Sequence, residues 1–362
     1  MKVIISGGGT GGHIFPAIAI ANALKAIDAK AEILFVGAEG RMEMEKVPAA
    51  GYKIEGLWIS GLQRRLTLDN LLFPFKVISS LMKSKKIIRS FRPDVAVGTG
   101  GFASGPLLRA AAGMNVPTLI QEQNSFPGIT NKLLSKRVNR ICVAYDGMAR
   151  YFPKEKIIVT GNPVRQDILS LAGKREEALK FFGLDSSRRT LLVIGGSLGA
   201  RTINESIAGC FELLIQSGIQ IIWQTGKSYT PTFANWGGRE GVRMSPFIVR
   251  MDLAYAAADV VVSRAGAISL SELAIARKPC ILVPSPNVAE DHQTKNAMAL
   301  VKKDAALLVR DAEAKQKLGA EIISLINDPV KQNKLSENIA KLGYPDAAEA
   351  IAREVIKITQ QK

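Results

Sequence analysis

The sequence predicts an α/β protein made of two nucleotide-binding-type domains, each with a parallel sheet. Two glycine-rich loops, Gly7–His13 and Gly195–Arg201, support this prediction, because each follows an apolar strand-like run and leads into a helix-like segment. Strand-like and helix-like stretches also alternate along the chain, which is typical of sheets with helices on both faces. A chain of 362 residues is long for one core and suits two domains.

Short apolar runs separated by helical stretches are the expected strands. In chain order they are Val3–Ser6, Ile33–Val36, Val95–Val97, Thr118–Ile120, Ile141–Ala144, Leu191–Ile194, Ile219–Trp223, Asp259–Val262 and Cys280–Val283. A linker is expected at Thr160–Arg165, because Asn-Pro after a glycine breaks regular structure. A terminal helix is expected over Ala347–Ile358, where apolar residues recur at helical spacing.

The composition indicates a folded protein with an anionic partner. With 47% hydrophobic and 22% charged residues, extensive disorder is excluded. The net charge of +16 fits nucleic acid, an anionic membrane surface or a phosphorylated substrate. Nucleic acid is the least favoured of these, because the chain has no zinc-finger spacing or RNP-like motif and only 6% aromatic residues.

Membrane-spanning and secreted proteins are not expected from this sequence. No apolar stretch is long enough for a transmembrane helix, and the N-terminus enters a strand at once, which leaves no room for a signal peptide. Cys142, Cys210 and Cys280 are far apart among apolar neighbours. We interpret them as reduced packing residues of a cytosolic protein and not as metal ligands.

The first glycine loop contains Gly7-x-Gly9-x-x-Gly12, the dinucleotide fingerprint, and Glu39 follows the second strand. An NAD-dependent enzyme is therefore one candidate. His13 weighs against it, because its ring would crowd a pyrophosphate at the end of the loop. His13 is one of only 2 histidines and lies between a glycine turn and a helix start. It is a candidate general base, because imidazole transfers protons near neutral pH.

Two further segments are expected at the same sheet edge as this loop. Gly98–Pro106 is a third glycine cluster after a strand, and Gln121–Asn124 follows the next strand. Ligands of open α/β sheets bind beyond the carboxyl ends of the strands. Any one of these segments could be only a turn, but the three together predict a binding wall.

The second half carries two polar segments that also follow strands. Ser269-x-x-Glu272 is either a capping box that satisfies helix N–H groups or a place where Glu272 accepts two ribose hydroxyls, and the spacing leaves both open. Pro284–Asn296 is either a surface loop or a source of hydrogen bonds for a sugar. The chain has no Asp-x-Asp, so a divalent-metal clamp on a diphosphate is not indicated.

Taken in order, these motifs resemble those of the N-acetylglucosaminyltransferases of peptidoglycan synthesis, which convert lipid I into lipid II. Each motif is short, but the ordered set is specific and covers most of the chain. The segments that carry the resemblance are Gly8–Pro16, Gly98–Phe102, Glu122–Asn124, Gly161–Arg165, Gly195–Arg201, Arg264–Ala267 with Glu272, and Asp291–Gln293.

The resemblance implies the GT-B architecture, in which two Rossmann-like domains with parallel sheets face a deep inter-domain cleft. Residues 1–162 would bind the acceptor, residues 163–344 would bind the UDP-sugar, and a helix at about 345–362 would pack back on the first domain. N-acetylglucosamine would pass from UDP-N-acetylglucosamine to the 4-hydroxyl of the muramyl sugar of undecaprenyl-diphosphate-linked muramyl-pentapeptide. The anomeric centre would invert, with no metal or other cofactor.

The same resemblance implies roles for individual residues. The expected UDP-N-acetylglucosamine contacts are Thr10, Gly11, Gly12, His13, Asn124, Arg165, Ser197, Ile248, Met251, Ala267, Ile268, Glu272 and Gln293. The acceptor diphosphate would lie on Gly9, Thr10, Gly100 and Gly101. His13 is the expected base, with Glu122 as the second choice. Some relatives carry His in place of Gln121 and Tyr in place of Phe102, so these two positions receive no catalytic role.

A lipid-linked acceptor also implies an anionic membrane surface as a partner. Apolar residues at roughly helical spacing lie among basic ones: Leu68, Leu71, Leu72, Phe75, Ile78 and Met82 beside Arg64, Arg65, Lys76, Lys83, Lys85, Lys86 and Arg89. Pro74 must start or kink any helix there. An amphipathic helix packed on the core is the commoner cause of such a pattern, but the net charge favours a lipid dock.

We therefore expect a peripheral protein on the cytoplasmic face of the bacterial cell membrane, with cell-wall and division proteins as further partners and no nucleic acid. Other functions stay open at this point. They are another GT-B UDP-sugar transferase or epimerase, a basic nucleotide-binding module without catalysis, and the NAD-dependent enzyme.

Overall fold

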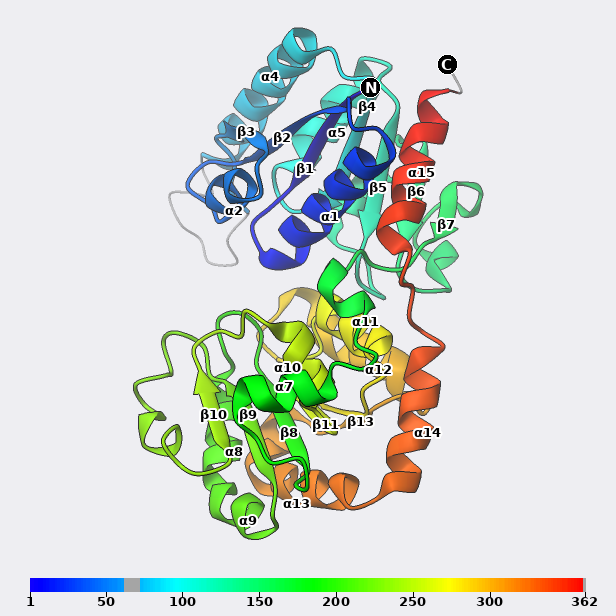
Figure 1. The fold of residues 1–362 in the computed structure, drawn as a ribbon. Helices are drawn as coiled ribbons and strands as arrows, with labels where there is room; N and C mark the ends of the chain where they lie inside the picture. Colours follow the sequence, from blue (N-terminus) through cyan, green and yellow to red (C-terminus); the bar gives the residue numbers. More distant parts are fainter. Residues whose placement is uncertain (62–71, 361–362) are drawn as a thin grey trace. The chain divides into compact units, whose positions relative to one another are not determined.

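A computed structural model describes residues 1–61 and 72–360 of the chain (Figure 1). The chain forms two compact units, one made of Met1–Val164 with Tyr344–Lys362 and the other of Arg165–Gly343. Each unit is an α/β domain with one sheet, which confirms the predicted fold class. Part of the expected membrane-facing pattern lies outside the described residues, namely Arg64, Arg65, Leu68 and Leu71.

The sheet of the first unit has 7 strands in the order β3-β2-β1-β4-β5-β6-β7, and all neighbouring strands are parallel. The strands are β1 (Lys2–Gly7), β2 (Glu32–Ala38), β3 (Lys53–Leu57), β4 (Val95–Gly100), β5 (Thr118–Glu122), β6 (Arg140–Val143) and β7 (Ile157–Val159). The helices are α1 (Gly11–Ile27), α2 (Glu43–Ala49), α4 (Phe73–Phe91), α5 (Ser104–Gly113), α6 (Ile129–Leu134) and α15 (Ala347–Thr359), with short 3₁₀ turns at Met148–Arg150 and Lys154–Lys156. The strand order reverses between β1 and β4, so the loops after these two strands lie side by side.

Both faces of this sheet are covered, which explains why its central strands read as continuous apolar runs. Ile4 of β1 packs in one apolar layer with helices α4 and α5, while Val3 and Ile5 pack in the opposite layer with α1 and α15. Pro74 lies in the first turn of α4 and starts that helix, as its fixed φ favours.

The last helix, α15, belongs to the core of the first unit. It packs along α1, beside the blue end of the ribbon in Figure 1. Ile351, Val355 and Ile358 are buried in the layer that also contains Val3 and Ile5. Burial of each such side chain contributes about 1.5–3 kcal/mol. The spacing of these residues is the helical spacing noted in the sequence.

The sheet of the second unit has 6 parallel strands in the order β10-β9-β8-β11-β12-β13. The strands are β8 (Thr190–Ile194), β9 (Gln220–Gln224), β10 (Val242–Ser245), β11 (Val260–Ser263), β12 (Cys280–Leu282) and β13 (Leu307–Leu308). The helices are α7 (Arg175–Phe182), α8 (Arg201–Gly209), α9 (Phe211–Gln216), α10 (Met251–Ala257), α11 (Ala267–Ile275), α12 (His292–Val301), α13 (Ala314–Ile326) and α14 (Pro329–Ala340). Short 3₁₀ turns lie at Gln166–Leu169, Ala234–Trp236, Ala289–Asp291 and Asp311–Glu313.

The strand order of this second sheet reverses between β8 and β11. The loops that follow these two strands, residues 195–200 and 264–266, therefore emerge next to each other within the unit. In the described part of the chain, no helix is both long and apolar enough to cross a bilayer.

Candidate functional site

The first glycine loop turns tightly between β1 and α1, and a buried carboxylate holds it. Glu43 on α2 accepts a hydrogen bond from the N–H of Gly9 at 2.9 Å with one oxygen and from the N–H of Ala38 at 2.9 Å with the other. Gly9 has a φ of +84°, which favours glycine. A Cβ on Gly8 would lie 2.1 Å from a Glu43 oxygen. The amide of Gly9, an expected diphosphate donor, is thus already bonded to Glu43.

The segment after β4 packs directly on this loop. Thr99 donates a hydrogen bond from its hydroxyl to the carbonyl oxygen of His13 at 2.8 Å. Gly100 and Gly101 have φ values of +101° and +86°. A Cβ on Gly101 would lie 2.2 Å from the carbonyl oxygen of Gly8, and a Cβ on Gly100 would lie 2.8 Å from the His13 ring. Glycine at these two positions therefore lets the two loops meet and makes room for the imidazole.

His13 lies in the first turn of α1, and its half-buried ring faces the end of β5. Its Nδ1 is 3.1 Å from Oε1 of Gln123, a buried residue that was not among the expected site residues. Thr10 is exposed at the N-cap of the same helix, and Gly11 and Gly12 follow it in the first turn. The first-turn N–H groups of a helix have no partner within it, so this turn can offer donors to an anion.

Glu122, the second-choice base, is buried and bonded within its own loop. One oxygen accepts from the backbone and the side-chain nitrogen of Asn124, at 3.0 and 3.1 Å. The other accepts from the side chain of Asn131 at 2.8 Å and the N–H of Gly128 at 3.1 Å. These bonds occupy the lone pairs of the carboxylate and hold Asn124 in place. Of the two side chains expected as a base, Glu122 is thus the one tied into its own loop.

The second glycine loop interlocks with the turn that follows β9. Gly199 has a φ of +79°, and a Cβ on it would lie 1.9 Å from the carbonyl oxygen of Thr225. A Cβ on Gly226 would lie 2.2 Å from the carbonyl oxygen of Leu198. Neither glycine can be enlarged without moving backbone, so this loop is rigidly placed at the start of α8.

Gln224 ties this glycine loop to the segment before α10. Its Nε2 donates to the carbonyl oxygen of Gly196 at 2.9 Å, and its Oε1 accepts from the N–H of Ile248 at 2.8 Å. One buried side chain therefore positions both the loop that presents the exposed Ser197 and the segment that carries Ile248. Ile248 and Met251 are themselves buried.

Glu272 lies inside α11, well past the start of that helix. The N-cap is Gly266, and no side chain caps the helix. The capping-box interpretation is therefore wrong, because Ser269 also lies inside the helix and cannot be its N-cap. Instead, the carboxylate of Glu272 accepts a hydrogen bond from the Tyr255 hydroxyl at 3.2 Å. Burial raises the pKa of Glu272 to about 7, although Arg165 and the Tyr255 hydrogen bond act to lower it.

The other expected residues of the second unit lie around the same sheet edge. Arg165 donates to both oxygens of Asp167, at 3.1 and 2.6 Å, and to the carbonyl oxygen of Val249 at 3.0 Å. Ala267 and Ile268 are the first two residues of α11. They therefore present backbone N–H groups at a helix start, next to the loop after β8.

Gln293, at the start of α12, has an amide whose orientation is fixed. Its Oε1 accepts from the N–H of Ala265 at 3.2 Å and from the N–H of Ser285 at 2.8 Å. Because both partners can only donate, the oxygen must face them, and the Nε2 group points the other way as a donor.

Two family models match the chain: the glycosyltransferase family 28 N-terminal domain over residues 3–143 and the family 28 C-terminal domain over residues 190–351. The chain belongs to glycosyltransferase family 28.

Relatives of this chain match over its whole length. A protein of Flavobacterium psychrophilum named UDP-N-acetylglucosamine--N-acetylmuramyl-(pentapeptide) pyrophosphoryl-undecaprenol N-acetylglucosamine transferase is 56% identical over 361 residues, which are 100% of this chain and 98% of that protein. A protein of the same name from Cytophaga hutchinsonii is 58% identical and covers 99% of this chain and 96% of its own length. The crystal structure of Acinetobacter baumannii MurG superposes with a TM-score of 0.79 at 25% identity, covering 98% of this chain and 99% of that one. These comparisons confirm the resemblance and the GT-B fold.

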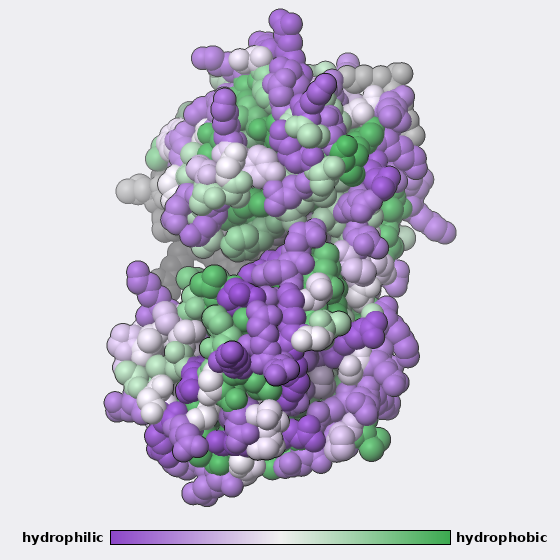
Figure 2. Space-filling view, in the orientation of Figure 1, coloured by the Kyte–Doolittle hydropathy of each residue, from purple (hydrophilic) through white to green (hydrophobic). Residues whose placement is uncertain are grey.

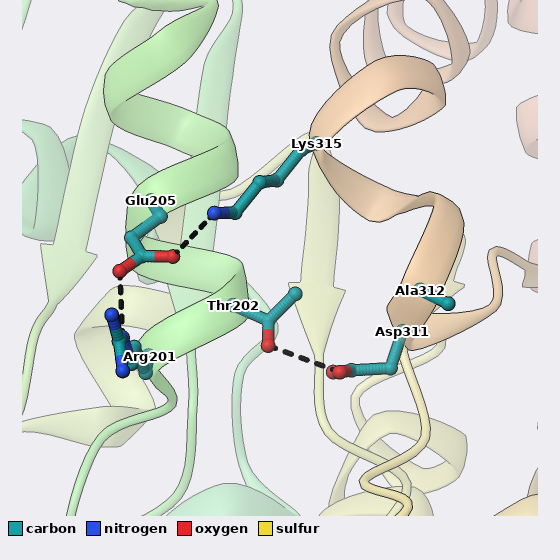
Figure 3. Close-up of a pocket in the computed structure, with 6 residues that line it drawn as sticks. All are labelled: Arg201, Thr202, Glu205, Asp311, Ala312 and Lys315. Carbon is teal, nitrogen blue, oxygen red and sulfur yellow. Dashed lines mark hydrogen bonds and ion pairs between the residues drawn. The ribbon is translucent and has the colours of Figure 1, made fainter.

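Two arginines of the segments that carry the resemblance, Arg201 and Arg264, have structural partners. An open hollow of about 450 Å³ lies between α8 and the start of α13. Figure 3 shows charged side chains from its two sides pointing toward one another. Glu205 pairs with Arg201 at 2.7 Å and with Lys315 at 2.8 Å. Asp311 accepts from Thr202 at 3.0 Å and also pairs with Arg264. The charges of the hollow are thus matched internally, so we do not regard it as a ligand site.

Helix α4 of this family 28 chain exposes apolar side chains beside basic ones. Leu72 at the N-cap is 44% exposed, and Phe75, Ile78 and Met82 within the helix are 65%, 57% and 68% exposed. Lys85 and Lys86 are also exposed, while Lys83 pairs with Glu39 at 3.0 Å and Lys76 is buried. Figure 2 shows hydrophobic and hydrophilic residues side by side over this helix. A helix packed only on the core would bury these apolar residues.

Proposed function

We propose that this family 28 enzyme transfers N-acetylglucosamine from UDP-N-acetylglucosamine to the 4-hydroxyl of the muramyl sugar of lipid I, giving lipid II. The observation that carries the proposal is the full-length similarity, at 56% and 58% identity, to transferases named for these two substrates. The reaction inverts the anomeric centre and uses no metal. The site residues described above are consistent with this chemistry.

The second unit binds the UDP-sugar in this proposal. Glu272 accepts the ribose hydroxyls, and Ile248 and Met251 pack beside uracil. The diphosphate lies at Ser197 and the N-terminus of α8, where the helix dipole favours negative charge, with Arg165 as the nearby cation. The outward Nε2 of Gln293 donates to a sugar hydroxyl, and the N–H groups of Ala267 and Ile268 add further donors.

The first unit binds the acceptor and supplies the base. The first turn of α1, with Thr10, Gly11 and Gly12, and the adjoining Gly100–Gly101 segment receive the acceptor diphosphate. Thr10, His13 and Asn124 contact the transferred sugar. Of the expected diphosphate residues, Gly9 shapes the loop through Glu43 and does not donate to the ligand.

The chemistry follows from these placements. His13 takes the proton from the muramyl 4-hydroxyl as the oxygen of that hydroxyl attacks the anomeric carbon. The bond from that carbon to the diphosphate breaks. UDP leaves as an anion, which the N-terminus of α8 and Arg165 stabilise. Removing one such donor typically lowers the rate by about 100-fold or more.

The direct test is transfer of labelled N-acetylglucosamine from UDP-N-acetylglucosamine to a short-chain lipid I analogue by the purified protein. A product with one added N-acetylglucosamine in a β-linkage is expected. Binding of the UDP-sugar without turnover on this acceptor would instead support a nucleotide-binding module. Transfer to a different acceptor, or epimerisation of the sugar, would identify another GT-B enzyme.

We further propose that α4 docks the enzyme on the cytoplasmic face of the bacterial membrane, where the acceptor's polyprenyl chain lies. The proposal rests on the exposed apolar residues of α4 and their basic neighbours. Reversible binding to vesicles with anionic lipid is expected, weakened by salt and by changing Lys83, Lys85 and Lys86 to glutamine. Activity on a soluble acceptor should survive, because none of the three is placed in the catalytic site.

Changing Lys227, Lys302 and Lys303 to glutamine is the matched control, because these residues are exposed on the second unit and the change in net charge is the same. Vesicle co-sedimentation measures both triple variants. Equal loss of binding in the two would show a general charge effect, and equal wild-type binding to neutral and anionic vesicles would contradict an electrostatic dock. Cell-wall and division proteins remain proposed further partners.

A further inference from the structure

We infer that Gln123, with Gln121 and Asn162 behind it, is a positioning residue that holds neutral His13 in the tautomer with Nδ1 protonated and Nε2 open. The tautomer follows from hydrogen bonds within the first unit. Its importance for catalysis rests on the proposed function, in which Nε2 of His13 is the base.

The side-chain amide of Gln123 can have only one orientation. Its Nε2 is 2.6 Å from the carbonyl oxygen of Thr99, and a carbonyl oxygen only accepts hydrogen bonds. The group at that position must therefore be the NH₂ group. The opposite end of the amide, which lies 3.1 Å from Nδ1 of His13, must be the oxygen. Because this oxygen also only accepts, Nδ1 must carry the proton.

The backbone carbonyl oxygen of Gln123 fixes the orientations of the side-chain amides of Asn162 and Gln121 by the same argument. Asn162 donates from Nδ2 to the backbone carbonyl oxygen of Gln123 at 3.0 Å, so its Oδ1 faces Gln121. Gln121 donates from Nε2 to that Oδ1 at 2.9 Å, so its own Oε1 accepts from Nε2 of Gln123. The three side chains are buried, so water does not compete for these bonds. Two backbone carbonyls thus determine the direction of every hydrogen bond that leads to His13.

The ring itself is also held in place. The carbonyl oxygen of His13 accepts from the buried Thr99 hydroxyl at 2.8 Å, and the Cε1 and Nδ1 atoms lie so close to Gly100 that a Cβ there would be 2.8 Å from each. Gly100 thus lies against the Nδ1–Cε1 side of the ring, and Nδ1 is directed at Gln123. Nε2, on the far side of the five-membered ring, is the nitrogen left for a substrate proton.

The partner of Nδ1 is a neutral amide and not a carboxylate. Two nearby carboxylates, Glu43 on α2 and Glu122 on β5, are bonded to backbone N–H groups, Glu43 to those of Gly9 and Ala38 and Glu122 to those of Asn124 and Gly128. On α15, which packs along α1, Glu349 pairs with Arg353 and Glu354 with Lys357. The basic residue of α1 is Lys25, at the opposite end of that helix. An amide oxygen selects the tautomer without adding a charge that would favour imidazolium. The opposite tautomer, with Nε2 protonated, prevails for free histidine in water, so the bonds must overcome that preference.

Nitrogen NMR on the full-length protein tests the tautomer without any activity measurement. The chain has only 2 histidines, so a ¹⁵N-histidine sample gives two imidazoles, and His13→Gln assigns them. At a pH where His13 is neutral, we expect Nδ1 at the protonated shift and Nε2 at the unprotonated shift. Gln123→Met, which removes the acceptor with little change in size, should move both shifts toward the free-histidine mixture. A neutral wild-type His13 with Nε2 protonated would overturn the inference.

Kinetics then separate positioning from a merely structural role. Gln123→Met should lower kcat by about 10-fold or more, less than the loss in a variant without the imidazole, with little change in KM for UDP-N-acetylglucosamine. Gln123→Glu keeps an acceptor for Nδ1 but places its second oxygen opposite the Thr99 carbonyl oxygen, which needs a donor, so this variant should retain the tautomer only while its new carboxyl is protonated. In Gln121→Met the Thr99 carbonyl still orients Gln123, so kcat should fall less than in Gln123→Met.

The two proposals fail in different ways. NMR could show His13 protonated on Nδ1 while kinetics show that turnover does not depend on His13. That result would contradict the role of His13 as the base but not the inferred tautomer. Normal kcat and an unchanged pH profile in a folded Gln123→Met variant, alongside a strong loss in His13→Gln, would contradict the positioning role and leave the base intact. Normal circular dichroism and melting temperature identify the folded variants.

Discussion

Replacing His13 with alanine should lower turnover by about 100-fold or more, the loss typical of a missing general base. Binding of UDP should change much less, because the proposed nucleotide contacts lie in the second unit. The acidic limb of the pH–kcat profile should also disappear, since it reports protonation of the base. Turnover on a soluble lipid I analogue and calorimetric titration with UDP measure the two effects separately.

Glu122→Gln is the informative companion to this variant. It keeps an oxygen and the size of the side chain, but it replaces an acceptor oxygen with an amide that cannot accept from Asn131 or Gly128. We therefore expect lower stability of its loop and a smaller kinetic loss than in His13→Ala. Near-normal turnover with an unchanged pH profile in His13→Ala would show that another group is the base.

Glu272→Gln should weaken binding of UDP-N-acetylglucosamine by about 10-fold or more, because hydrogen bonds to a charged group contribute about 1.5–3 kcal/mol. The pH dependence is the sharper test. Burial raises the pKa of Glu272 to about 7 in the free enzyme, and the ribose hydroxyls need the ionised form as acceptor. Affinity should therefore be full above pH 7 and fall as the pH drops below it. Titration calorimetry between pH 5.5 and 8.5, a range of about three units centred near that pKa, measures this.

The same variant should lose affinity for the UDP-sugar but should not lose stability against unfolding. A carboxyl whose pKa is raised on folding stabilises the protein at low pH, and this contribution is lost as the pH rises from about 4.5 to about 7. Above pH 7 the wild type buries a charge that Glu272→Gln does not, so the variant should melt no lower than the wild type. A lower melting temperature with unchanged UDP-sugar affinity and unchanged pH dependence would show that Glu272 serves only the fold.

The central strands could be predicted from the sequence, while the edge strands could not. β1, β4, β8 and β11 are buried on both faces and read as apolar runs. In β3, partly buried residues alternate with exposed ones, β10 has only one fully buried residue, and β13 has only 2 residues. Such segments do not differ from loops in composition, so only pairing with a neighbouring strand makes them strands.

The candidate site could be predicted in its chemistry but not in its hydrogen bonds. The glycine loops, His13 and Glu272 carry local patterns. The residues that support them have no local pattern, because Gln123 contacts His13 from 110 positions away in sequence and Glu43 contacts Gly9 from 34 positions away. A buried glutamine in a polar run carries no signal of its own. The strand order that brings β1 beside β4 and β4 beside β5 would be needed to find it. The capping-box alternative failed for a related reason, since the helix start at Gly266 depends on where β11 ends.

The position of α15 also gives the protein an order of assembly during synthesis. A ribosome releases the first 164 residues and then the whole second unit before the last helix emerges. Until then, the apolar face of α1 and the layer around Val3 and Ile5 lack the cover that Ile351, Val355 and Ile358 provide. The second unit is continuous in sequence and can complete its core first. The unit that is synthesised first is therefore the unit that completes its core last. A nascent chain that stalls before residue 347 leaves this apolar surface exposed to chaperones and proteases.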